Sequence, residues 1–272
     1  MKLGTLVKPL LFSGLFLAGS VMAAPSAQQV LAASPVDDIV ERYPAMMSEG
    51  IREGLKRNQQ LPPMVADTIG YVVTNSFRAV DIEQQIVKNL EQELSGSQLE
   101  AVESWYKTPV AQKISTAEIA ASDPAAWQQI QARAMELNRK YKGTDRARMF
   151  ERFDRASRAT ESAVDTTIAV QLGLATAMAA FSSGSENYDE LKQSIENQRE
   201  TIRGVVEQQV YDSYLHTYEN ISSQEMGLYI DFLESGAGSA FSKTVTGSIQ
   251  QAISEPVESI GSQLARFLSP QK

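Results

Sequence analysis

The stretch LSGSQLEAVESWYKTPVAQKIS, Leu94–Ser115, carries the signals for two short helices separated by a tight break. Ser95 and Gln98 have the S-x-x-[E/Q] spacing of a capping box, in which each side chain satisfies a free backbone N–H at the start of a helix. The aromatic pair Trp105–Tyr106 closes that helix, and the dipeptide Thr108–Pro109 follows it. Threonine suits the N-cap of a second helix and proline suits its first position. The stretch therefore predicts a helical hairpin.

A second stretch has the same order of signals. ISSQEMGLYIDFLESGAGSAFS, Ile221–Ser242, aligns with the first without a gap, at a constant offset of 127 residues. Its capping box is Ser222 and Glu225, Phe232 replaces the tryptophan, and Ser235–Gly236 forms the break. A hairpin of this size buries little apolar surface alone, so we expect the two copies to pack against longer helices or against each other.

The two stretches resemble the bacterial family of unknown function DUF2059, whose pattern is an aromatic pair followed by S-P-x-G-x-[KR]. The first stretch has Ala111 at the glycine position and Lys113 at the basic position. The second has Gly236 in place of the proline, Gly238 at the glycine position and Ala240 in place of the basic residue. The resemblance implies an exported helical protein, mostly of Gram-negative bacteria, with no established activity and no catalytic residues to carry over.

The rest of the chain also indicates helices. Apolar residues recur at spacings of three and four, while alternating strand patterns are nearly absent. We therefore expect an all-α bundle of about ten helices with two pseudo-repeated halves, 35–143 and 144–270. Each half holds one hairpin motif (94–115 and 221–242), and the halves share one core. Residues 24–34 are small and polar, and we expect a flexible segment there.

A long helical segment is expected from Asp145 to Phe181. Its second part, residues 163–181, is apolar almost all round, and Ala169, Gly173 and Ala177 place small residues at a spacing of four. Small residues at this spacing let another helix approach closely. The segment is interpreted as the central buried helix of the fold, with self-association through it as the alternative.

Residues 1–23 have the order of a secretory signal peptide. Lys2 and Lys8 flank a short apolar run, and Val21 and Ala23 supply the small residues of a cleavage site after Ala23. The run is short for a membrane span, which needs about 20 residues. We expect cleavage, no transmembrane anchor afterwards, and a location in the periplasm of a Gram-negative bacterium. The chain has no cysteine, so it is not a lipoprotein.

Composition narrows the function. The net charge is −8, and loss of two lysines with the signal peptide makes it −10, which disfavours nucleic acid as a partner. The absence of cysteine excludes disulfides and thiol chemistry. His216 is the only histidine, read as a half-exposed helix residue or, alternatively, a pH-sensitive contact. No nucleophile, zinc or nucleotide motif is present, and we expect no cofactor, metal or catalytic residue.

Residues 138–158 form a basic segment in this acidic chain. One interpretation is a patch that binds an anionic ligand or partner. The other is internal pairing, with the i,i+4 pairs Glu151–Arg155 and Asp154–Arg158 as examples. The basic residues are Arg139, Lys140, Lys142, Arg146, Arg148, Arg152, Arg155 and Arg158.

These observations lead to one functional hypothesis and two alternatives. The hypothesis is a non-catalytic binding, scaffold or chaperone-like protein of the cell envelope, whose unknown partner is another envelope protein or a second copy of the chain. The first alternative is a carrier of a lipid or apolar small molecule in a groove between helices. The second is an envelope hydrolase that uses carboxylates alone.

Overall fold

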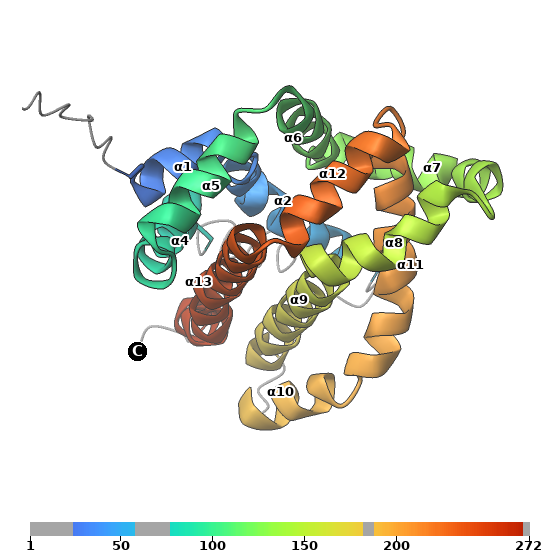
Figure 1. The fold of residues 1–272 in the computed structure, drawn as a ribbon. Helices are drawn as coiled ribbons and strands as arrows, with labels where there is room; N and C mark the ends of the chain where they lie inside the picture. Colours follow the sequence, from blue (N-terminus) through green and yellow to red (C-terminus); the bar gives the residue numbers. More distant parts are fainter. Residues whose placement is uncertain (1–23, 58–76, 182–187, 269–272) are drawn as a thin grey trace, which may run out of the picture.

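The computed structural model describes residues 24–57, 77–181 and 188–268. This part of the chain contains 12 α-helices and no strand (Figure 1), which confirms the all-α prediction. The helices are α1 (Ala27–Ala33), α2 (Val36–Arg57), α4 (Ala79–Glu93), α5 (Gly96–Tyr106), α6 (Pro109–Ala121), α7 (Pro124–Tyr141), α8 (Asp145–Ser157), α9 (Ala159–Phe181), α10 (Tyr188–Glu196), α11 (Arg199–Thr217), α12 (Ser223–Glu234) and α13 (Gly236–Leu268).

Helices α9 and α13 lie side by side at the centre of the molecule (Figure 1). α13 also packs on α4 and α5, while α9 packs on α11. Val164, Ile168 and Leu172 of α9 are buried inside the chain, as the central-helix interpretation requires. No helix within the described ranges combines the length and apolarity needed to cross a membrane.

The apolar core consists of three clusters, and each draws residues from both sides of residue 143. Met47 and Val164 belong to the first cluster, and Ile86 and Phe241 belong to the second. Ile114 and Leu137 belong to the third cluster, whose other buried members follow residue 143. Within the described residues, the halves 35–143 and 144–270 therefore do not have separate cores.

Both quoted stretches form hairpins that begin with a capping box. The backbone N–H of Gln98 donates to Ser95 Oγ (3.3 Å), and Ser95 N–H donates to Gln98 Oε1 (2.9 Å). Glu225 N–H donates to Ser222 Oγ (3.2 Å), and Ser222 N–H donates to Glu225 Oε2 (2.7 Å). These reciprocal bonds confirm the predicted helix starts.

The break in each hairpin is capped by its hydroxyl residue. Thr108 Oγ1 accepts from Ala111 N–H (3.2 Å), and Pro109 is the first residue of α6. Ser235 Oγ accepts from Gly238 N–H (3.0 Å) at the start of α13. The second break is tighter, because α12 continues one residue further along the alignment than α5.

The two hairpins pack on each other, and one of their contacts joins equivalent residues. Trp105 stacks on Phe232, the residue at the same position of the other stretch, with ring centroids 4.7 Å apart. Lys113 Nζ lies 2.9 Å from Glu225 Oε1, and Glu225 occupies the position of Gln98. Contact between equivalent residues is what an approximate two-fold relation would produce.

Residues 24–34 do not form the flexible segment that was expected. They contain helix α1, which starts with a capping box of Ser26 and Gln29. Val30 and Leu31 are fully buried in the cluster that also holds α4 and α5. The prediction was wrong because small residues hide a short amphipathic helix whose stability comes from tertiary packing.

The expected long helix from Asp145 to Phe181 is interrupted at Arg158, which adopts left-handed backbone angles (φ 60°). Asp154 Oδ1 accepts the N–H of Thr160 (2.7 Å) and so satisfies the start of α9. The predicted Asp154–Arg158 ion pair is therefore wrong, because the chain leaves the helix between the two residues. At the other end of the chain, α13 contains Pro256.

Candidate functional site

Three concavities adjoin one another along α11. The apolar chamber (about 320 Å³) and the central chamber (about 280 Å³) share Val210 and Ser213. The central chamber and the outer chamber (about 470 Å³) share Ala121 and Thr217. We refer to the three together as the α11 crevice. Because neighbouring chambers share lining residues, we treat the three as one elongated candidate site.

Each chamber is lined by a different set of residues. The apolar chamber is lined by Trp127, Ile130, Gln131, Ala163, Thr167, Val206, Gln209, Val210, Asp212 and Ser213. The central chamber is lined by Glu118, Ala121, Ser122, Phe153, Ala159, Val210, Ser213, Tyr214, Thr217 and Tyr218. The outer chamber is lined by Ala117, Ala120, Ala121, Asp123, Ala125, Ala126, Gln129, His216, Thr217 and Asn220.

The crevice exists because short side chains face one another between helices that are held in place elsewhere. The α6–α7 corner contributes five alanines to the outer chamber, and α9 contributes Ala163 and Thr167 to the apolar chamber. Asn138 Nδ2 donates to Asp212 Oδ1 (2.7 Å) and ties α7 to α11. Interiors normally pack with few voids, so space of this size between helices requires such ties to keep it open.

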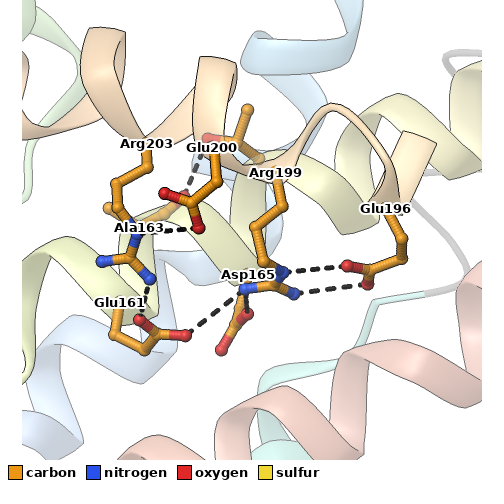
Figure 2. A network of polar contacts seen from close by, with 8 residues as sticks. Glu161, Ala163, Asp165, Glu196, Arg199, Glu200 and Arg203 are labelled. Carbon is orange, nitrogen blue, oxygen red and sulfur yellow. Dashed lines mark hydrogen bonds and ion pairs between the residues drawn. The ribbon is translucent and has the colours of Figure 1, made fainter.

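An ion network holds α9 against α10 and α11 beside the apolar chamber (Figure 2). Arg199 lies between Asp165 (2.7 Å), Glu161 (3.3 Å) and Glu196 (2.8 Å). Arg203 pairs with Glu161 as well. The Arg203 hydrogen bond, and then the charges of both arginines, hold the pKa of Glu161 below its usual range. Figure 2 places Ala163, a wall of the apolar chamber, next to these pairs.

Glu118 is the chemically distinctive residue of the crevice. Its Oε1 accepts hydrogen bonds from the phenol groups of Tyr218 (2.6 Å) and Tyr229 (2.8 Å). Both tyrosines are buried, at 4% and 6% exposure, whereas Glu118 keeps part of its surface open on the central chamber. Burial raises the pKa of Glu118, and the two phenol hydrogen bonds oppose that rise.

The tyrosines around Glu118 cannot act as bases near neutral pH. Burial and then the nearby Glu118 charge raise the pKa of Tyr229 well above its usual value, and the same two causes raise the pKa of Tyr218. Burial raises the pKa of Tyr214, another wall of the central chamber, to about 12. The phenols therefore remain protonated donors that fix the orientation of the carboxyl group.

Sequence reasoning did not single out Glu118, although a signal was present. It follows Ile114 by four residues, on the apolar stripe of α6. At the offset of 127, the second stretch continues to Val245, which is buried. A carboxyl group at a core position of one copy, with valine in the other, marks a site where packing alone does not decide the residue.

His216 lies in the outer chamber as a half-buried residue, with Nδ1 buried and without a hydrogen-bond partner. Burial lowers the pKa of His216, and the positive charge of Arg133 lowers it further. Beside it, Glu219 accepts from Arg133 (2.7 Å) and Lys140 (2.8 Å). These two bonds lower the pKa of Glu219 to about 2. At neutral pH the imidazole is therefore uncharged.

Most basic side chains of residues 138–158 form hydrogen bonds or ion pairs within the protein. Arg146 is buried at 5% exposure and donates to the carbonyls of Tyr218 (2.6 Å) and Ile221. Arg152 pairs with Asp231 and Glu234 on α12. These contacts favour the internal-pairing interpretation for the centre of the segment.

The remaining basic residues divide into two groups. In the first group, Lys140 pairs with Glu219, Arg148 with Asp145, and Arg155 forms the predicted pair with Glu151 (3.0 Å). The side chains of three residues form no hydrogen bond or ion pair with the side chain or backbone of any described residue: Arg139, Lys142 and Arg158. None of the eight basic residues and none of the twelve hairpin-motif residues is among the described lining of the crevice. The hairpin residues instead form caps, breaks and ring contacts between helices.

A comparison with known protein families finds a match over one part of the chain. The model of DUF2059, an uncharacterized protein conserved in bacteria, matches residues 80–140. This confirms the resemblance for the first stretch, while the second stretch lies outside the match and remains an unconfirmed copy. The matched segment includes Glu118 and the α6–α7 wall of the crevice, but not α9 or α11. No curated protein and no solved structure matches the chain.

Within the described ranges, no group of three or more His, Asp or Glu side chains is placed to hold a metal ion.

Proposed function

We propose that the protein is an exported, non-catalytic binding protein of the bacterial cell envelope that takes an apolar ligand into the α11 crevice. The adjacency of the three chambers along α11, through the lining residues that they share, supports this proposal. Ligand sites are concave and mostly apolar, with few polar groups that fix orientation. The crevice has this composition, with Trp127, Ile130 and Val206 at one end and Glu118 in the middle.

Of the readings that the sequence left open, the carrier has the strongest support. A scaffold needs a broad contact surface, and the large exposed apolar side chains among the described residues are few: Val80, Met135, Val205 and Leu228. A crosslinking pulldown from the periplasm tests the scaffold reading directly, because a reproducible protein partner would favour it over the carrier.

The carboxylate-only hydrolase has less support. Glycoside hydrolysis, for example, uses two carboxyl groups about 5–9.5 Å apart. Glu118 is the one carboxyl group among the described lining residues of the central chamber, and two phenols already occupy its Oε1.

The proposal is tested by filling the crevice. Val210 lies where the apolar and central chambers meet, so Val210→Phe should block both. Val205 is on the same helix and is 59% exposed, so Val205→Phe is the matched control. We expect the uncharged fluorescent probe N-phenyl-1-naphthylamine to bind the wild type and Val205→Phe, and to lose at least tenfold in affinity for Val210→Phe.

Two outcomes would contradict the proposal. One is equal binding of the probe by both variants, which would place the apolar site elsewhere. The other is no binding by the wild type, combined with a native mass spectrum that shows no carried molecule. Export is tested separately, because the mature protein isolated from its host should begin at Ala24.

A further inference from the structure

The ionisable groups on the wall of the crevice have one sign of charge. Among the described lining residues they are three carboxylates, Asp212, Glu118 and Asp123, and the neutral His216. One carboxylate lies in each chamber, and neither lysine nor arginine is among these lining residues. The charges that line the crevice therefore favour a cationic ligand over an anionic one, although Arg133 and Arg146 lie behind the walls of the outer and central chambers.

Two of the three carboxylates are engaged in holding the fold. Asp212 Oδ1 accepts from Asn138 (2.7 Å) and Gln208 (2.8 Å). Asp123 is the N-cap of α7 and accepts from the N–H of Ala125 (2.8 Å). Their positions follow from helix packing and capping, so neither needs a ligand to explain it.

Glu118 differs because its charge has no partner. Both phenols bond to Oε1, and no described residue forms a hydrogen bond with Oε2 or an ion pair with Glu118. The nearby cation Arg42 donates instead to the carbonyl of Ile119 (2.5 Å) and to Ser122 Oγ (3.3 Å). Burying a carboxylate without a counter-charge is costly, and a cation that enters the chamber would remove that cost.

The surroundings of Glu118 also suit a cation. The two phenols hold the carboxyl group in one orientation before any ligand arrives, which reduces the entropy that binding must overcome. Phe153, Tyr214 and Tyr218 line the same chamber, and aromatic rings attract cations that approach their faces. Next to this polar centre, the apolar chamber offers room for a hydrocarbon group.

We propose that the α11 crevice selects small molecules with a protonated amine on an apolar body, and that Glu118 binds the ammonium group while the apolar chamber takes the hydrocarbon. This inference rests on the proposed function, since it names the class of ligand for the same site. It places the specificity in the one crevice carboxylate that the fold leaves unpaired.

Three probes with the same tail test the inference. Octylammonium, octanol and octanoate are titrated calorimetrically into the full-length mature protein at pH 8 and low salt. A hydrogen bond to a charged group contributes about 1.5–3 kcal/mol, so octylammonium should bind about tenfold to a hundredfold more tightly than octanol. Octanoate should bind most weakly of the three.

The substitution Glu118→Gln provides the residue-level test. The amide oxygen can still accept from both phenols, so the variant should fold, and it should bind octylammonium and octanol equally. Glu100→Gln removes the same charge from an exposed position on α5 and should leave the tenfold preference intact.

The outcomes separate the two proposals. Equal binding of all three probes by the wild type, tightest binding of octanoate, or a preference that survives Glu118→Gln would overturn the inference while the apolar crevice stands. Failure of every probe to bind would overturn the proposed function, and the inference with it.

Discussion

The substitution Gly238→Ala tests how closely the chain approaches itself at the break between α12 and α13. Gly238 is the third residue of α13. A Cβ at this position would lie 2.0 Å from the carbonyl oxygen of Phe232 and 2.8 Å from its carbon. Cβ contacts below 3.0 Å are essentially never observed, and both neighbours are backbone atoms that no rotamer change can move away. The break must therefore open by about 1 Å.

The cost can be estimated from two opposing effects. Overpacking of this kind costs about 1–3 kcal/mol, and the higher helix propensity of alanine returns up to about 1 kcal/mol. A net loss of about 1–2 kcal/mol corresponds to a fall in melting temperature of about 2–8 °C for a chain of this size. Gly247 is in the same helix, and a Cβ there meets no atom within 4 Å. Gly247→Ala should therefore stabilise the protein by about 0.5–1 kcal/mol.

Thermal unfolding followed by far-ultraviolet circular dichroism distinguishes the two variants. A Gly238→Ala protein that melts at or above the wild-type temperature, while Gly247→Ala also gains stability, would refute the close approach. The first hairpin provides an internal comparison, because Ala111 occupies the equivalent position and is buried there. The wider break after α5 accepts the methyl group that the tighter break after α12 excludes.

Three further predictions follow from the buried groups and ion pairs. Arg146→Met leaves the carbonyl of Ile221 without its side-chain donor and should lower the free energy of unfolding in urea by about 1–3 kcal/mol, whereas Arg148→Met, at an exposed position, should change it by less than about 0.5 kcal/mol. Glu219 has its pKa lowered to about 2 from 4.5, so its pairs stabilise the protein above about pH 4.5 and lose that effect as the pH falls toward 2. Urea unfolding at several pH values should show the stability gap between the wild type and Glu219→Gln shrinking over that range, and a constant gap would contradict the assignment. Gly173→Leu should overpack the buried face of α9 and cost about 1–3 kcal/mol, and a variant with unchanged urea midpoint would show that α9 is not central.

The sequence predicted best those features whose signals are local. The capping boxes at Ser95 and Ser222, and the breaks at Thr108 and Ser235, each involve residues three apart, and the structure has all four. The break between α8 and α9 could not be predicted, because helices that end in a left-handed residue usually carry glycine or asparagine there. The left-handed residue here is Arg158.

The crevice could not be predicted because it depends on which small residues face one another across different helices. Ala121, Ala163 and Ser213 are unremarkable in sequence, and each would pack well in a closed interface. They leave space here because contacts elsewhere, such as Asn138 with Asp212, fix the separation of the helices. A sequence pattern gives the face of each helix but not the distance between faces.

The comparison between the two hairpins locates function more sharply than either hairpin alone. Both hairpins use the same kinds of cap and break, and the rings of Trp105 and Phe232, which occupy the same position in the alignment, stack on each other. The two aligned stretches differ in chemistry four residues after Ile114. The second helix continues its apolar stripe with Val245, whereas the first places Glu118 where a valine would pack. Two buried tyrosines from α11 and α12 direct their hydroxyl groups at that carboxylate, so the surrounding helices are adapted to the exception. A fold that needed only a core at this position would not require a carboxyl group and two phenol donors, which is why our proposal assigns the open oxygen of Glu118 to a ligand.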